Sequence, residues 1–247
     1  MRLLTWFVLY GIALCVGLAR RGYRARIGPL PGPNPQRARR LLVVGASGGT
    51  GRRLVAQALE RGCEVTALVR NPSRLGVDHP RLTVVPGDVL DLASVETAMR
   101  GQDAVLSALG HKRFFYPTRI LSQGTRNILR AMESHGVRRL VCVTSLGIGD
   151  SAGRLGLLYT LFVIPAILPF YFWDKARQER IIAGSDVDWV IVRPGALTNG
   201  TKRGRLDHGA RAGSYLWSVF VSRAEVAEFM LDQLESNTYL RAAPGVA

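Results

Sequence analysis

Residues 41–51 have the sequence LLVVGASGGTG, in which four apolar residues are followed at once by a glycine-rich turn. A short run that is apolar at every position is typical of a strand buried on both faces of a parallel sheet. The next residues, 52–61, have one apolar face when they are drawn as a helix. This stretch therefore predicts a strand, a tight turn and a helix that packs back against the strand.

The spacing of the glycines gives each of them a separate role. Gly45 allows the tight turn, Gly48 lets the backbone approach a pyrophosphate, and Gly51 lets the helix pack on the strand. The N–H groups at the start of the helix attract phosphate, so the motif predicts dinucleotide binding. The alternative interpretation is a glycine turn needed only for packing. The expected cofactor contacts in the turn are Gly45, Ser47, Gly48, Gly49, Thr50 and Gly51.

The rest of the chain continues the alternation of strands and helices. Strands that are separated by crossover helices indicate a doubly wound parallel sheet of the Rossmann type. We expect one such domain over residues 40–247. Further strands are predicted at 64–69, 82–85, 104–108, 140–144 and 189–192, and further helices at 92–99, 117–135, 174–183 and 222–234.

The end of the second strand indicates which cofactor is bound. An acidic residue there would accept a hydrogen bond from a ribose 2′-hydroxyl, but this chain has Arg70, with Arg74 following. Arginines suit the 2′-phosphate of NADP(H), although NAD(H) remains possible and both side chains could simply face solvent. Asp88, after the third strand, is expected to contact the adenine edge or to cap the next helix.

The charge distribution argues against a nucleic-acid binder. The net charge is +15, but residues 1–40 contain eight arginines and no acidic residue, so more than half of the excess lies in this tail. No recognition motif for nucleic acid accompanies the charge. The three cysteines are scattered along the chain, which predicts neither a disulfide framework nor a metal site.

The N-terminal residues resemble a membrane anchor. Residues 3–19 carry no charge, and arginines follow directly after them. We therefore expect a transmembrane anchor at 1–19 in contact with membrane lipid, a basic linker rich in proline and glycine at 20–39, and a single-pass protein with a cytoplasmic catalytic domain. A cleaved secretory signal is the alternative, but the charge order is the reverse of the usual one.

Residues 155–173 form a second uncharged stretch. Pro165 and Pro169 interrupt any single long helix, and a membrane crossing here would separate the last strand from its sheet. The stretch is expected to be either a buried flap over the active site or an interfacial segment that admits an apolar substrate.

Five motifs together resemble the atypical short-chain dehydrogenase/reductase branch, which includes NmrA-like proteins and flavin (biliverdin-IXβ) reductase. They are GASGGTGR, GDVLD, GQDAVLSALG, SQGTRNILRAMESHGVRRLVCVTSLG and DWVIVRPG, and the resemblance covers about residues 40–235. It implies that Asn127 supports the active site. It also implies that the cofactor is lined by Ala108, Leu109, Gly110, Pro194 and Gly195.

The resemblance further implies a catalytic group of Ser, Tyr and Lys. Tyr171 and Lys175 form a Y-x-x-x-K pair, and Ser145 ends a predicted strand. Lys175 would lower the pKa of the tyrosine, Tyr171 would exchange the substrate proton, and Ser145 would hold the substrate oxygen. Tyr171 also belongs to an aromatic cluster, where its position next to a lysine could be fortuitous. His111 is a further candidate.

These observations predict an NADP(H)-dependent oxidoreductase that acts on a small, apolar acceptor, namely a carbonyl, quinone or flavin-like compound. The alternative is a membrane-tethered sensor or assembly factor that binds NADP(H) without turnover. Fold and cofactor motif alone do not distinguish the two.

Overall fold

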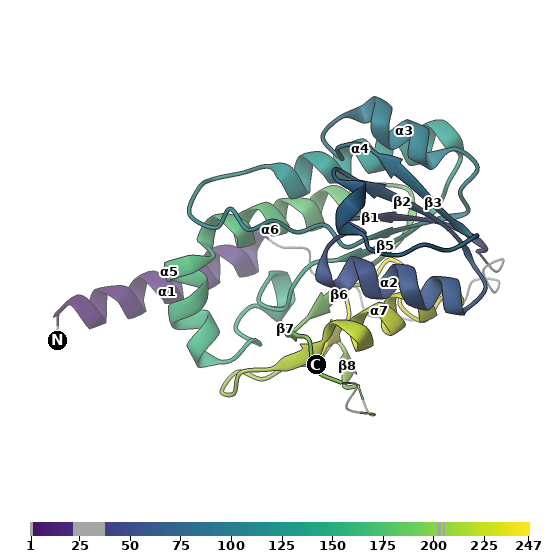
Figure 1. Cartoon of the computed structure of the whole chain (residues 1–247). Coiled ribbons are helices and arrows are strands. Elements are labelled where there is room, and N and C mark those ends of the chain that lie inside the picture. Colours follow the sequence, from purple (N-terminus) through teal and green to yellow (C-terminus); the bar gives the residue numbers. More distant parts are fainter. Residues whose placement is uncertain (1, 22–37, 202–203, 205) are drawn as a thin grey trace.

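The computed structural model describes residues 2–21, 38–201, 204 and 206–247. Its centre is an eight-stranded sheet with the order β3-β2-β1-β4-β5-β6-β10-β8 (Figure 1). Neighbouring strands are parallel except for the pair of β8 and β10. The strands are β1 (Arg40–Val44), β2 (Glu64–Val69), β3 (Leu82–Pro86), β4 (Ala104–Ser107), β5 (Arg139–Val143), β6 (Asp188–Pro194), β8 (His208–Gly209) and β10 (Gly245–Val246).

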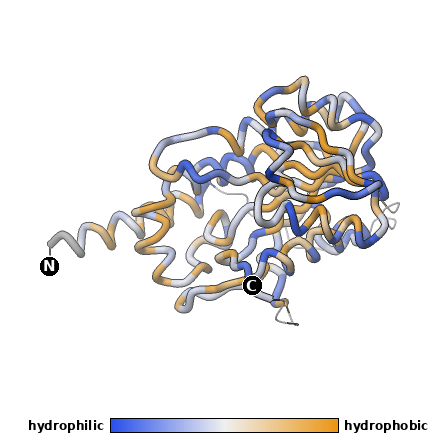
Figure 2. Tube along the Cα trace, in the orientation of Figure 1, coloured by the Kyte–Doolittle hydropathy of each residue, from blue (hydrophilic) through white to orange (hydrophobic). Residues whose placement is uncertain are grey.

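Helices cover both faces of the sheet. The helices α2 (Gly49–Glu60) and α7 (Arg223–Asp232) lie on one face, and α3 (Leu92–Met99), α4 (Ile120–His135) and α6 (Pro169–Ala183) lie on the other. In β1, Leu41 points into the first layer and Leu42 into the second, and both are fully buried. The central strands are correspondingly hydrophobic along their length (Figure 2). The predicted doubly wound Rossmann sheet is confirmed.

Most predicted elements agree with the structure to within three residues, and the differences have physical reasons. α4 begins at Ile120 rather than Pro117, because the carboxylate of Asp174 accepts hydrogen bonds from the backbone N–H groups of Leu121 and Ser122. α6 begins at Pro169 rather than Asp174, since proline suits a first turn. The unpredicted strands β7 (Ala196–Thr198), β8, β9 (Phe220–Ser222) and β10 have two or three residues, too few to show a period.

The uncharged stretch 155–173 is divided, as its prolines predicted. A π-helical turn, η3 (Tyr159–Val163), leads into the short helix α5 (Ile164–Ile167), and α6 follows. Leu168, with φ −116° and ψ 17°, interrupts the helical path between α5 and α6. Part of the stretch is buried, Phe172 included, whereas Leu158 is 56% exposed.

The N-terminal helix α1 (Arg2–Arg21) packs along α5, α6 and η3 (Figure 1). Leu14 and Leu18 are buried against apolar residues that include Ile164 and Phe172. Among the described residues, no helix is long and apolar enough to cross a membrane.

The predicted transmembrane anchor at 1–19 is therefore unsupported, and the predicted single-pass membrane localisation with a cytoplasmic domain is wrong. The physical reason is that part of the apolar surface of α1 is used in packing against the domain. Most of the linker predicted at 20–39, residues 22–37, lies outside the described residues.

Candidate active site

The glycine-rich turn after β1 is shaped by contacts that exclude larger side chains. Gly45 has φ +80°, and a Cβ placed on it would lie 2.7 Å from the carbonyl oxygen of Ala108, which follows β4. A Cβ on Gly51 would overlap the carbonyl oxygen of Gly45. The turn can therefore form only with glycine at these two positions, as the sequence motif requires.

The start of α2 is open to an anion. Gly48 precedes the helix and provides no side chain to cap it, so the first-turn N–H groups remain available to a phosphate. Ser47 is half-buried beside them and Thr50 is buried. The glycine-rich turn and the first turn of α2 therefore fit a pyrophosphate at this end of the helix.

Arg223, at the start of α7, lies at the same place and was not predicted. Its side-chain Cδ and Nε are 2.6 Å from the position that a Cβ on Gly49 would occupy. Its guanidinium donates a hydrogen bond of 2.8 Å to Asn199 Oδ1. Ser222 and Glu225 form a capping box that begins α7 here, and this sequence pattern was the available signal.

Arg70 and Arg74 lie beyond the end of β2. Both side chains are exposed, and Arg74 belongs to the short 3₁₀ helix η1 (Pro72–Arg74), whose first turn is capped by Asn71. Neither arginine makes an ion pair within the described part of the chain. Their positive charge is available to a ligand phosphate.

Asp88 lies in the segment after β3, and Asn127 of α4 contacts the same segment. Asp88 Oδ1 accepts a 3.0 Å hydrogen bond from Leu90 N, whereas Asp91 is the residue that caps α3. The capping role considered for Asp88 therefore belongs to Asp91. The buried side chain of Asn127 donates a 2.9 Å hydrogen bond to Val89 O, so it ties α4 to this segment.

The carboxyl ends of β4, β5 and β6 bring the remaining predicted residues to one edge of the sheet. Ala108, Leu109 and Gly110 follow β4, and half-buried Ser145 follows β5. Pro194 ends β6, and its carbonyl accepts a 3.0 Å hydrogen bond from Leu146 N. Gly195 is buried next to it. Ligands bind at this edge in open parallel sheets.

Tyr171 reaches this edge from α6. Its hydroxyl lies 3.5 Å from the position that a Cβ on Gly110 would occupy. The ring of His111 meets the tyrosine ring edge-on, with centroids 4.9 Å apart, and the ring of Phe114 lies 5.7 Å away. The tyrosine is thus held between α6 and the loop after β4.

Lys175 lies one helical turn from Tyr171 and is 2% exposed. Its Nζ donates a 3.2 Å hydrogen bond to Val143 O and lies 5.3 Å from the centre of the Tyr171 ring. The structure brings Tyr171 and Lys175 together, but in the described residues neither Lys175 nor Ser145 hydrogen-bonds the tyrosine hydroxyl. The lysine is held by the backbone at the end of β5.

His111 lies beside Tyr171 and is partly buried. Burial lowers the pKa of His111, and the nearby positive charges of Lys175 and Arg113 lower it further against the opposing effect of Asp174. Its Nε2 lies 3.0 Å from the hydroxyl oxygen of Thr118. Its Nδ1 accepts a 3.1 Å hydrogen bond from Arg113 N, so both ring nitrogens have partners within the loop after β4.

A buried ion pair supports this region, and sequence reasoning missed it. Arg193 of β6 and Glu179 of α6 are 1% and 0% exposed, and two hydrogen bonds of 2.9 and 2.7 Å join them. Thr144, after β5, donates a 2.7 Å hydrogen bond to the same carboxylate, and Asp150 pairs with the guanidinium from the other side. An arginine inside the apolar run of residues 188–194 was the available signal.

Comparison with known proteins agrees with this arrangement. Residues 45–237 match the NAD(P)H-binding family. An uncharacterized chloroplastic protein of Arabidopsis thaliana is 30% identical over 210 residues, which cover 81% of this chain and 74% of that protein. A 3-beta-hydroxysteroid dehydrogenase of Mycolicibacterium neoaurum is 38% identical over 117 residues, which cover 43% of this chain and 32% of the dehydrogenase.

The solved structures show the same fold. A short-chain dehydrogenase/reductase of Veillonella parvula, determined in complex with NADP, superimposes with a TM-score of 0.69 at 20% identity, covering 85% of this chain and 94% of that one. Dehydrogenases and reductases among the relatives agree with the expected oxidoreductase class. The resemblance seen in the sequence motifs is confirmed, and the chain belongs to the NAD(P)H-binding family.

Proposed function

We propose that this protein is an NADP(H)-dependent oxidoreductase that acts on an apolar carbonyl, quinone or flavin-like acceptor. The observation that carries the proposal is the position of Tyr171, whose hydroxyl lies 3.5 Å from the position that a Cβ on Gly110 would occupy, at the carboxyl edge of the sheet. The buried Lys175 beside Tyr171 and the match to the NAD(P)H-binding family support a role for this tyrosine as proton donor.

Different residues of the chain would have different roles in the reaction. When bound, the nicotinamide supplies or accepts the hydride. The glycine turn and Arg223 would hold the pyrophosphate, and Arg70 with Arg74 would hold a 2′-phosphate. In reduction, Tyr171 would give its proton to the substrate oxygen while Ser145 donates a hydrogen bond to the same oxygen. The Nζ of Lys175, 5.3 Å from the centre of the Tyr171 ring, would lie beside the tyrosine throughout this step.

The surroundings of Tyr171 favour an apolar acceptor. Phe114 packs against the tyrosine ring, and the next residues of the loop, Phe115 and Tyr116, are 68% and 72% exposed. Aromatic rings of this kind are suited to a flat, apolar ring system. The dehydrogenase relative named for a hydroxysteroid is consistent with this class.

Turnover tests the proposal. The full chain is incubated with NADPH and a panel of quinones, flavins and apolar ketones, and oxidation of NADPH is followed by absorbance. We expect Tyr171→Phe to lower kcat about 10²- to 10⁴-fold while NADPH affinity is kept. Tyr215→Phe, at an exposed tyrosine that packs on Arg154, is the matched control and should retain full activity. Equal rates for Tyr171→Phe and the unmodified protein would refute a catalytic tyrosine.

One observation favours a second candidate function, that of a sensor or assembly factor that binds NADP(H) without turnover. Lys175 donates to Val143 O rather than toward the tyrosine hydroxyl. A sensor would be stabilised by NADPH, would oxidise none of the panel, and would be unaffected by Tyr171→Phe. Contact of α1 with membrane lipid stays a separate prediction, which flotation with lipid vesicles tests.

A further inference from the structure

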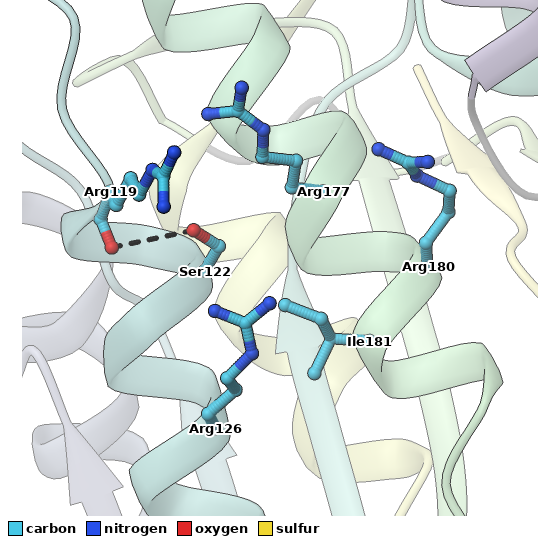
Figure 3. Close-up of a pocket in the computed structure, with 6 residues that line it drawn as sticks. All are labelled: Arg119, Ser122, Arg126, Arg177, Arg180 and Ile181. Carbon is cyan, nitrogen blue, oxygen red and sulfur yellow. Dashed lines mark hydrogen bonds between the residues drawn. The ribbon is translucent and has the colours of Figure 1, made fainter.

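A cavity on the opposite side of the molecule from α2 carries an unusual set of charges. It has a volume of about 370 Å³ and lies between α4 and α6. Figure 3 shows the residues that line it: Ser122 and Arg126 on α4, Arg119 just before α4, and Arg177, Arg180 and Ile181 on α6. We propose that this cavity binds a small anion with two or more phosphate groups.

The four guanidinium groups have no acidic partner within the described part of the chain. Arg126 donates only a 3.4 Å hydrogen bond to the neutral amide of Gln123. Like charges gathered around one cavity repel each other, and no ion pair among the described residues offsets that repulsion. A bound anion would offset it, and guanidinium groups present paired donors that match phosphate oxygens.

The helix end of α4 does not by itself form the site. The carboxylate of Asp174 already accepts hydrogen bonds from the backbone N–H groups of Leu121 and Ser122, at 2.9 and 3.3 Å. Asp174 is fully buried. The anion must therefore be held by the arginine side chains, with Ile181 as an apolar wall.

The size and charge of the cavity define the ligand class. A volume of about 370 Å³ is that of a small-molecule site. Four positive groups exceed what one carboxylate requires, and they suit a pyrophosphate or bisphosphate group. Such a group is found both in free anions and in the headgroup of a polyphosphorylated lipid. The cavity is separate from the glycine turn, because α2 covers the other face of the sheet.

The experiment uses the full chain with NADPH at saturation, so that the glycine turn is not available to the probe. Inorganic pyrophosphate is titrated into the NADPH-saturated protein by calorimetry. A second titration without NADPH shows how much pyrophosphate the glycine turn itself binds. We expect saturable binding that the double variant Arg126→Gln/Arg177→Gln weakens tenfold or more. Arg130→Gln, at an exposed arginine of α4 that does not line the cavity, is the matched control and should bind as the unmodified protein does.

A second arm distinguishes the source of the phosphate. Flotation is compared between vesicles of phosphatidylcholine alone and vesicles that also contain phosphatidylinositol bisphosphate. Flotation that requires both the bisphosphate lipid and Arg126 with Arg177 identifies a headgroup, whereas pyrophosphate binding without flotation identifies a free anion. Circular dichroism melting verifies that the variants are folded. If the double variant does not fold, Arg177→Lys replaces it, because this substitution keeps the positive charge but removes the paired donors of the guanidinium.

The proposal is overturned if neither probe binds, or if the double variant and Arg130→Gln bind pyrophosphate equally. Because the cavity shares no residue with the glycine turn, these outcomes are independent of NADPH turnover. Failure of the oxidoreductase assay would leave the pyrophosphate result unchanged.

Discussion

The guanidinium of Arg193 and the carboxylate of Glu179 face each other in the protein interior, joined by hydrogen bonds of 2.9 and 2.7 Å. The pair connects β6, which ends in Pro194, to α6, which carries Tyr171 and Lys175. Both side chains are almost completely removed from water, so each charge depends on the other to replace the solvation that it loses on burial.

Glu179→Gln is therefore expected to be strongly destabilising. Loss of the carboxylate removes an acidic partner from the buried Arg193 charge, which also pairs with Asp150, and should lower the free energy of unfolding by about 3–5 kcal/mol. Asp232→Asn is the control, because it breaks an exposed ion pair with Arg61 and should cost at most about 1 kcal/mol. Urea denaturation measures both, and equal costs would contradict the buried role.

Gly45→Ala is expected to damage both the fold and the cofactor site. The added Cβ would lie 2.7 Å from Ala108 O, at φ +80°. Gly76→Ala is the matched control, because φ is +65° there but no atom lies within 4 Å of the added Cβ. The control should cost about 1–2 kcal/mol for the backbone conformation alone.

Thermal melts with and without NADPH separate the two effects. Gly45→Ala should cost more than Gly76→Ala and should also lose the upward shift in Tm that NADPH produces. An unchanged NADPH shift in Gly45→Ala would show that the turn does not approach the cofactor.

Arg70→Ala/Arg74→Ala is expected to change cofactor preference. Loss of two charge-assisted contacts to a 2′-phosphate should weaken NADPH binding at least about a hundredfold, since each contributes about 1.5–3 kcal/mol, and should leave NADH binding unaffected. Arg53→Ala, at an exposed arginine of α2, is the control. Fluorescence titration with both cofactors measures the effect, and an equal loss for NADPH and NADH would rule out recognition of the 2′-phosphate.

The position of His111 predicts a pH dependence of stability. Its pKa lies below the ordinary value of about 6.5, because burial disfavours the charged ring. The unfolded chain then binds the proton more readily, so this group makes the protein less stable as pH falls from about 6.5 through the pKa of the folded state.

Titration of the imidazole resonances by NMR measures this pKa directly. In denaturation curves at a series of pH values, His111→Gln should be less sensitive to pH below about 6.5 than the unmodified protein. A His111 pKa at or above 6.5 would contradict the expected burial.

The layers of the fold could be predicted from local residue patterns. Each buried strand is an apolar run bounded by turn residues. The turn after β1 has glycine at Gly45 and Gly51, where an added Cβ would overlap the backbone. The i, i+4 spacing of Tyr171 and Lys175 likewise follows from the helix alone. These features depend on residues close in sequence, so they can be predicted without knowledge of the rest of the chain.

Other features depend on residues far apart in sequence, and only the tertiary contacts determine them. α1 carries no charge over residues 3–19, which suggested a membrane anchor, but Leu14 and Leu18 are buried by residues more than a hundred positions away. Lys175 donates to Val143 O, and Arg193 meets Glu179, because β5 and β6 lie side by side beneath α6. The same packing of α4 on α6 gathers the four arginines of the cavity. Periodicity determines which face of an element is buried, but the assembled fold determines which partner that face meets.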